Sequence, residues 1–154
     1  MGIFRRLLGG GSAGREPLKP QRLDYLNEAL ALERRGDFEA AIVSYRLALR
    51  DHPNDPRVLQ NLAIASSRTG RLEDAIRHYR RALELDATLA GAHYGLGFLL
   101  LKRGETDGAA KHLRAFLGNP PRGPDGQRWV AHAEAALREV DVVPPQAAAG
   151  MEGA

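Results

Sequence analysis

One arrangement of residues recurs along this sequence at a fixed interval of 34 positions. The stretch GDFEAAIVSYRLALRDHP begins at residue 36, and the closely similar GRLEDAIRHYRRALELDA begins at residue 70. Among the positions that keep one residue type in three successive copies are Gly36, Gly70 and Gly104, Ala41, Ala75 and Ala109, and Leu49, Leu83 and Leu117. A period of this length is typical of solenoids, in which each unit packs only against its neighbours.

Each unit contains two helical patterns separated by a glycine. In the first unit, apolar residues share one helix face before the glycine and another after it. These residues are Tyr25, Ala29 and Leu32, then Ala41, Tyr45, Ala48 and Leu49. Gly36 stands where a helix ends and the chain turns, and Pro53 and Pro56 stop the second pattern. The sequence therefore predicts helical hairpins at residues 22–55, 56–89 and 90–121.

The repeated hairpin resembles the tetratricopeptide repeat, a family built from 34-residue helical hairpins. The residues that carry the resemblance are Tyr25, Ala29, Leu32, Ala41, Tyr45, Ala48 and Pro53 in the first unit, Leu59, Leu62, Ala63, Ala75, Tyr79 and Ala82 in the second, and His93, Leu96, Gly97, Leu100, Ala109, Leu113 and Pro121 in the third. Glu28, Ser66 and Phe116 depart from the family's pattern, which has leucine, tyrosine and alanine there. The resemblance implies an all-α superhelical solenoid of three hairpins.

The segments outside the three units have their own character. The proline- and glycine-rich stretch GNPPRGPDGQ precedes a helical pattern at 125–140, which we expect to cap the last exposed face of the solenoid. Trp129 is expected to pack in that cap, and stacking on a ligand is the alternative. Residues 1–20 are predicted to be a flexible basic tail, and residues 141–154 a disordered tail.

No motif indicates an enzyme, a cofactor or a metal site. The chain has no cysteine, and Gly9, Gly11 and Gly14 match a dinucleotide fingerprint without the strand and helix that it needs, which indicates a linker. His78 and His112 occupy equivalent places in successive units. They are expected to be surface histidines, with a two-histidine site as the alternative. Acidic residues lie near arginines at helical spacing, as solvated ion pairs do. We expect a non-catalytic protein without a cofactor.

Positive charge is concentrated at the N-terminal end of the chain. The net charge is +3, and residues 1–20 hold four basic residues against one acidic residue, so the remainder is balanced. A nucleic-acid-binding face requires basic residues clustered in the folded part. We therefore expect a protein or peptide partner and no nucleic acid.

The resemblance implies a concave groove lined by the first helix of each unit. Transferred to this sequence, the groove positions are Asn27 and Leu30, with Leu26 beside them, then Arg57, Gln60, Asn61, Ile64 and Arg68, then Tyr94, Phe98 and Lys102. This set combines an apolar floor, amide side chains and a basic edge. Such a surface suits an extended or helical peptide.

Asn61 is the position most strongly expected to contact a ligand, because many peptide-binding members of the family carry asparagine there. The alternative for Asn61 is that its side chain only solvates a helix face. A separate alternative holds for Tyr94 and Phe98, which the C-terminal helix would then bury. Members that grip the terminal carboxylate of chaperone tails need cations. The matching positions here are Leu26, Leu30, Asn61, Gly91 and Gly95. The sequence therefore speaks against that mechanism.

The first residues of the chain suggest a second hypothesis. The apolar residues Ile3, Phe4, Leu7 and Leu8 lie beside Arg5 and Arg6, an arrangement that makes weak contact with an anionic membrane surface. Two alternatives remain, a disordered tail and docking into a groove of the same chain or of a neighbour, which would make a homo-oligomeric scaffold. We expect a cytoplasmic protein, in the second hypothesis one peripheral to the membrane.

Overall fold

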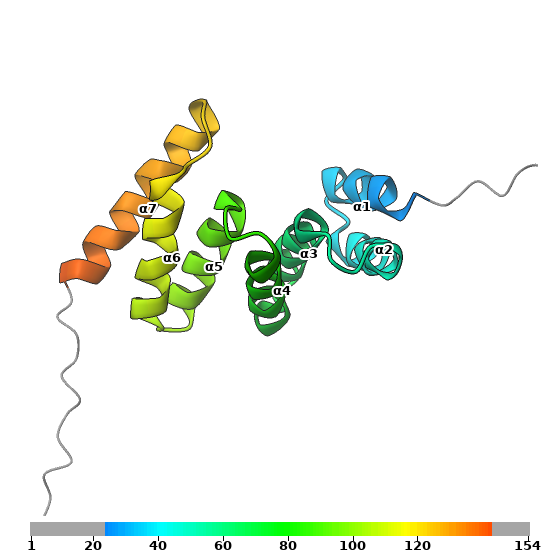
Figure 1. Cartoon of the computed structure of the whole chain (residues 1–154), viewed down its shortest axis with the longest axis horizontal. Coiled ribbons are helices and arrows are strands. Elements are labelled where there is room, and N and C mark those ends of the chain that lie inside the picture. Colours follow the sequence, from blue (N-terminus) through cyan, green and yellow to red (C-terminus); the bar gives the residue numbers. More distant parts are fainter. Residues whose placement is uncertain (1–23, 143–154) are drawn as a thin grey trace, which may run out of the picture.

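The computed structural model describes residues 24–142, and these residues form helices joined by short turns (Figure 1). The helices are α1 (Tyr25–Arg34), α2 (Phe38–Asp51), α3 (Pro56–Arg68), α4 (Leu72–Leu85), α5 (Ala90–Lys102), α6 (Thr106–Gly118) and α7 (Pro124–Val142). The described part contains no strand, so the prediction of an all-α fold is confirmed. The expected membrane-contact residues at positions 3–8 lie outside the described residues, as does the whole predicted N-terminal tail.

The same turn closes all three hairpins. Gly36, Gly70 and Gly104 have φ angles of 78°, 77° and 79°, which side-chain-bearing residues rarely adopt. In each turn the residue after the glycine donates its backbone N–H to a carbonyl near the end of the preceding helix, at 2.9 Å every time. The 34-residue interval is therefore the interval between three copies of one helix-ending motif.

The core lies between neighbouring helices and continues along the whole stack. Ala29, Ala63 and Gly97 are buried one unit apart, where the helices of each hairpin approach one another. A Cβ at Gly97 would lie 2.8 Å from the side chain of Leu113, so α5 and α6 pack closely because this position has none. Small residues therefore set the spacing within each hairpin.

The departures from the family's pattern each have a local explanation. Ser66 is fully buried and donates to the carbonyl of Leu62 in the preceding turn, at 2.7 Å. Glu28 accepts a hydrogen bond from Ser44 of α2 at 3.1 Å. Phe116 is fully buried in a cluster formed by α5, α6 and α7. The helix that covers this position is α7, which is not part of the 34-residue repeat. Its packing around Phe116 therefore differs from the packing in the other units, which have alanine at the equivalent position.

The last helix is longer than the sequence predicted. It runs from Pro124 to Val142, whereas the sequence predicted a helix at residues 125–140. Asp141 and Val142, which were predicted to belong to the disordered tail, are therefore helical. Asp141 forms an ion pair with Arg114 of α6 at 2.8 Å, which ties this end of α7 to its neighbour. The rest of the predicted tail, residues 143–154, lies outside the described residues.

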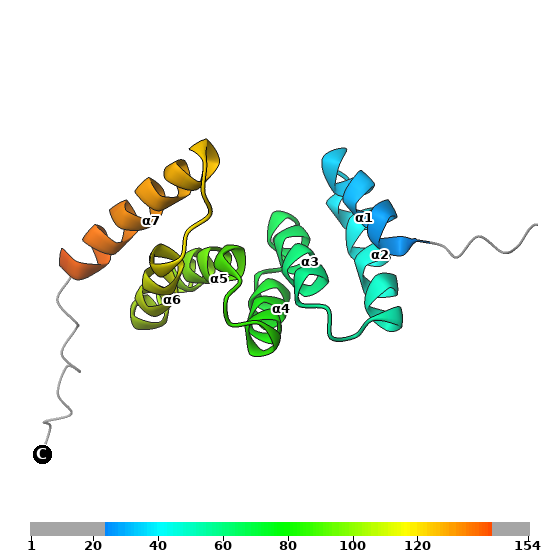
Figure 2. The same ribbon diagram turned by 45° about the horizontal axis from the view of Figure 1, so that its top comes forward.

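The helix pairs follow one another along an arc, and α1 and α7 both lie on its upper side in Figure 2. Within residues 24–142, no helix is long and apolar enough to cross a membrane. Residues of α3 and α5, the first helices of the second and third hairpins, and of α7 line one hollow.

Candidate functional site

Side chains of α3, α5 and α7 line an open hollow of about 740 Å³, which we call the groove. Residues from α4 and from two connecting segments complete it. The lining residues are Arg57, Gln60, Asn61, Ile64, Ser67, Arg68, Tyr79, Leu89, Ala90, Gly91, Tyr94, Gly95, Pro121 and Trp129. The groove thus spans the second and third hairpins and the capping helix.

Six of the ten predicted groove residues line this hollow. They are Arg57, Gln60, Asn61, Ile64, Arg68 and Tyr94. All but Tyr94 lie on α3, and Tyr94 extends from the first turns of α5. The structure therefore brings together the residues predicted from the second unit and one aromatic residue from the third.

The other four predicted residues lie elsewhere. Asn27 is occupied at the start of α1, where its backbone and side-chain N–H groups donate to Asp24. Leu30 packs against the core of the first hairpin, and Lys102 is exposed at the end of α5. Phe98 stacks on His132 of α7, with ring centroids 4.2 Å apart. The capping helix therefore covers Phe98, which was the alternative for this residue.

Two glycines form the floor of the groove. Gly91 and Gly95 lie one unit after Arg57 and Asn61, so α5 presents bare backbone where α3 presents long side chains. A Cβ at Gly95 would lie 2.4 Å from the phenol of Tyr79, and one at Gly91 would lie 3.0 Å from Nε2 of Gln60. The Tyr79 ring reaches the floor of the groove because Gly95 has no side chain. Its burial raises the pKa of the phenol, which keeps the hydroxyl protonated.

Gln60 carries a polar atom that no described residue satisfies. Its Oε1 is buried without a hydrogen-bond partner within residues 24–142. A buried acceptor without a partner costs about 1–3 kcal/mol. The Gln60 side chain lines the groove, but Oε1 itself is not open to it, so a ligand N–H group would reach this atom only after the side chain turned.

Asn61 lies near Tyr45, which belongs to the core of the first hairpin. The hydroxyl of fully buried Tyr45 donates to the carboxylate of Glu33. Burial, together with Glu33, raises the pKa of Tyr45, and the nearby Asn61 side chain opposes that rise. Asn61 also lines the groove, so it lies between this core and the open hollow.

Aromatic rings form the wall of the groove on the side of α7. The ring of Tyr94 packs edge-on against Phe116 at 5.1 Å and lies 5.8 Å from the ring of Trp129. The Tyr94 hydroxyl makes a 2.6 Å hydrogen bond with Nδ1 of His132. Trp129 remains 42% exposed although it contacts this cluster. It therefore packs against the cap, as expected, and also presents a ring face to the groove.

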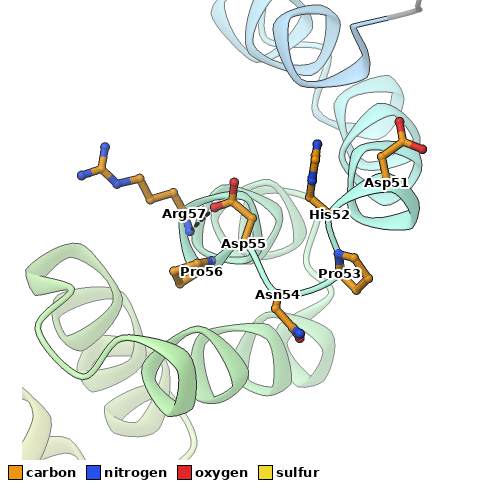
Figure 3. Close-up of a pocket in the computed structure, with 7 residues that line it drawn as sticks. All are labelled: Asp51, His52, Pro53, Asn54, Asp55, Pro56 and Arg57. Atoms are coloured by element: carbon orange, nitrogen blue, oxygen red, sulfur yellow. Dashed lines mark hydrogen bonds between the residues drawn. The ribbon is translucent and has the colours of Figure 1, made fainter.

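The groove is basic at both ends of α3. No acidic residue lines it, and neither Arg57 nor Arg68 has a carboxylate within 4 Å among residues 24–142. Arg68 lies over the ring of Phe38 at 5.7 Å. Figure 3 shows Asp55 turned towards the backbone at the start of α3, where it accepts from the N–H of Arg57 at 3.0 Å, while the guanidinium of Arg57 extends away.

A second hollow, of about 570 Å³, is lined by residues 51–57 of the turn between α2 and α3 (Figure 3). Its polar groups serve the fold, because Asp55 caps the backbone of α3. One turn supplies the whole lining, and it brings together no set of side chains from different helices.

Two histidines form a pair in the third hairpin. Nδ1 of His93 lies 3.0 Å from Nδ1 of His112, and Nε2 of His93 lies 2.9 Å from the carbonyl of Ala87. The partner of His112 is therefore His93, and not His78 as the two-histidine alternative required. Burial lowers the pKa of His112, and His93, Lys111 and Arg80 lower it further. Within residues 24–142, no group of three or more potential ligand side chains is arranged to hold a metal ion.

Sequence reasoning missed the groove residues that lie outside the second unit. Gly91 and Gly95 are the equivalents of Arg57 and Asn61 in the next unit, 34 residues later. From the sequence, these glycines were interpreted only as a loss of cationic side chains. They also predict that α5 has no side chains of its own at these two groove positions. Trp129 and Pro121 carry no such signal, because α7 and the segment before it are not part of the repeat.

Comparison with known families identifies the hairpins. A family model described as a tetratricopeptide repeat matches residues 24–65, and one described as a TPR repeat matches residues 67–104. Together they account for residues 24–104 apart from Ser66. No curated protein sequence matched the chain significantly.

Solved structures share the fold. The Yersinia enterocolitica type III secretion chaperone SycD, in complex with a peptide of the translocator YopD, aligns with a TM-score of 0.70, 17% identity, and coverage of 77% of this chain and 90% of that one. The Sgt2 TPR domain from Aspergillus fumigatus aligns with a TM-score of 0.64, 24% identity, and coverage of 84% and 88%. The second TPR of Spaghetti (RPAP3), bound to an HSP90 peptide, aligns with a TM-score of 0.59, 19% identity, and coverage of 60% and 86%. With three hairpins of one register, two family matches and these neighbours, the chain belongs to the tetratricopeptide repeat family.

Proposed function

We propose that this chain is a non-catalytic protein–protein interaction module that binds a peptide segment of a partner in the groove. The observation that carries the proposal is the stripe of α3 side chains, Arg57, Gln60, Asn61, Ile64 and Arg68, which line one hollow together with Tyr94 and Trp129. An extended peptide offers backbone N–H and C=O groups, which amide side chains of this kind pair with. The SycD and Spaghetti (RPAP3) structures each contain a bound peptide, which supports the same use of this fold here.

A peptide selection with the full chain tests the proposal. Random peptides enriched on the immobilised chain are synthesised with blocked ends, and their dissociation constants are measured by fluorescence anisotropy. We expect Asn61→Ala to weaken binding about fivefold, because one hydrogen bond to the peptide backbone is lost. Val43→Ala is the control, because Val43 lies on α2, is 58% exposed and does not line the groove.

Two results would contradict the proposal. One is the absence of any enriched peptide. The other is a set of enriched peptides that bind Asn61→Ala and Tyr94→Ala as tightly as the unmodified chain, which would place binding on another surface. Circular dichroism of each variant shows whether its helical content is preserved, so that a loss of binding reports on the groove and not on the fold.

A further inference from the structure

We propose that the groove selects a specific class of peptide, an acidic segment in which two acidic residues flank a large apolar residue. This inference rests on the proposed function and names the chemistry of its ligand. Three features of the groove carry it: the spacing of two arginines on α3, the absence of acidic lining residues, and the apolar surface between the arginines.

The arginines stand at the two ends of a single stripe. Arg57, Asn61, Ile64 and Arg68 follow one another at three- and four-residue steps on α3, so all four lie on one face of the helix. At 1.5 Å per residue, Arg57 and Arg68 are about 16 Å apart along the helix axis. An extended peptide rises about 3.3 Å per residue, so this distance matches a separation of about four to six residues. Successive side chains of an extended chain point to opposite faces, so acidic residues about four or six positions apart would both face α3 and could reach the two guanidinium groups.

Arg57 and Arg68 differ from the other unpaired arginines in lining the groove. Among residues 24–142, Arg34, Arg35, Arg46, Arg50, Arg122 and Arg138 also have no carboxylate within 4 Å, but none of them lines it. Arg71, Arg77, Arg81, Arg103, Arg114 and Arg128 each have a carboxylate within 3.1 Å. Arg57 and Arg68 have none within 4 Å among residues 24–142, although Arg57 is near enough to Asp86 to help lower the pKa of that carboxyl, after its hydrogen bonds with Thr88. Cations at both ends of a groove without acidic lining favour an acidic occupant.

The middle of the groove is apolar and has room for a large side chain. Ile64 and Leu89 lie among its lining residues, together with the rings of Tyr94 and Trp129. The side chains of Tyr79 and Gln60 fill the places that Cβ atoms at Gly95 and Gly91 would take, so they form part of the groove surface over α5. An aromatic or branched apolar residue between the two acidic residues would meet this surface.

The charge of the chain's own first residues argues against their occupying the groove. Residues 1–20 carry four basic residues and one acidic residue, so they share the sign of the arginines that they would meet. A partner of opposite charge therefore fits the groove better than this segment does.

The test uses the peptides enriched on the full chain. We expect the pattern of two acidic residues about four or six positions apart, with a large apolar residue between them, to dominate the selection. Arg57→Ala with Arg68→Ala should weaken binding of these peptides about five- to tenfold, since two exposed charge pairs are removed. The matched control is Arg46→Ala with Arg50→Ala, an equal change of charge at exposed positions of α2 that do not line the groove.

Salt separates this inference from a neutral apolar groove. Binding to the unmodified chain should weaken as ionic strength rises, and the salt dependence should be smaller in the Arg57 and Arg68 double variant than in the Arg46 and Arg50 control. Enriched peptides that require Asn61 but lack acidic residues, or that bind both double variants equally, would overturn this inference while leaving the proposed function intact. Competition by a synthetic peptide of residues 1–20 would also overturn it, because the groove would then accept a basic segment.

Discussion

At the scale of single residues, the groove depends on positions where a side chain is missing. Gly95 lies inside α5, where glycine lowers helix stability, yet Tyr79 of the neighbouring helix occupies the space that a Cβ would fill. The residue is therefore suited to the contact between helices and not to the helix itself. The same reasoning applies to Gly91 and the amide of Gln60, with a less severe contact.

The first prediction concerns Gly95→Ala. The new Cβ lies 2.4 Å from the Tyr79 phenol, so the buried ring must move. Forcing extra atoms into a packed site costs about 1–3 kcal/mol, which exceeds the gain of about 1 kcal/mol from helix propensity. We expect a net loss of stability in urea unfolding. Gly118→Ala, at the last residue of α6 with nothing within 4 Å, should show no comparable loss, and equal effects of both changes would contradict this account.

At the scale of helix pairs, the histidines of the third hairpin connect α5 and α6. If the Nε2–H of His93 donates to Ala87, then Nδ1 of His93 accepts from Nδ1–H of His112. Protonating His112 would add a positive charge to a half-buried ring near Lys111 and Arg80, which is why burial and these cations lower its pKa.

The second prediction is a pH dependence of stability. Because the folded-state pKa of His112 is below its ordinary value, the unfolded chain binds more protons when the pH lies between the two. Stability should therefore fall as the pH decreases below about 6.5, down to the folded-state pKa. Urea unfolding at several pH values should show this fall weakened in His112→Gln. The same change at His52, which is exposed in the turn after α2, should leave it intact. An identical pH profile for His112→Gln and the unmodified chain would exclude this pair as its source.

The repeated helices were predictable from the sequence because their residues act locally. Gly36 ends a helix, Asp37 begins the next by accepting from the N–H of Ala40, and Tyr45 packs in a cluster of the first hairpin and the adjoining helix α3. The end of α7 was not predictable, since it depends on the contact of Asp141 with Arg114 of another helix. The candidate site divides in the same way. The α3 stripe was expected from the family resemblance, whereas the covering of Phe98 by α7 depends on the path of the non-repeating segment before Pro124.

At the scale of the whole molecule, stability should be distributed along the stack, because each unit packs mainly against its neighbours. The capping helix α7 has one neighbouring helix layer, formed by α5 and α6, and its apolar residues join a single cluster with Phe116. It is therefore the element whose loss disturbs the rest of the core least. Trp129 is the only tryptophan, so its fluorescence reports on α7 alone.

The third prediction concerns Leu137→Ala. Leu137 is 8% exposed and belongs to the cluster between α6 and α7, so its truncation should cost about 2–4 kcal/mol. In this variant the fluorescence transition of Trp129 should occur at lower urea concentration than the loss of helical circular dichroism. Ile42→Ala in the first hairpin is the comparison, because that change should lower the circular dichroism transition first. Coincident transitions in both variants would show that the chain unfolds as one cooperative unit.

The position of α7 gives the number of hairpins a meaning beyond stability. The groove joins Asn61 to Trp129 across one intervening hairpin, α5 and α6. A chain lengthened by one copy of the unit after residue 89 would repeat the same packing along its core, but Trp129 would then stand a whole unit further from Asn61. The number of repeat copies between α3 and α7 therefore sets the distance between the polar side chains of α3 and the aromatic side chains on the side of α7 in the groove.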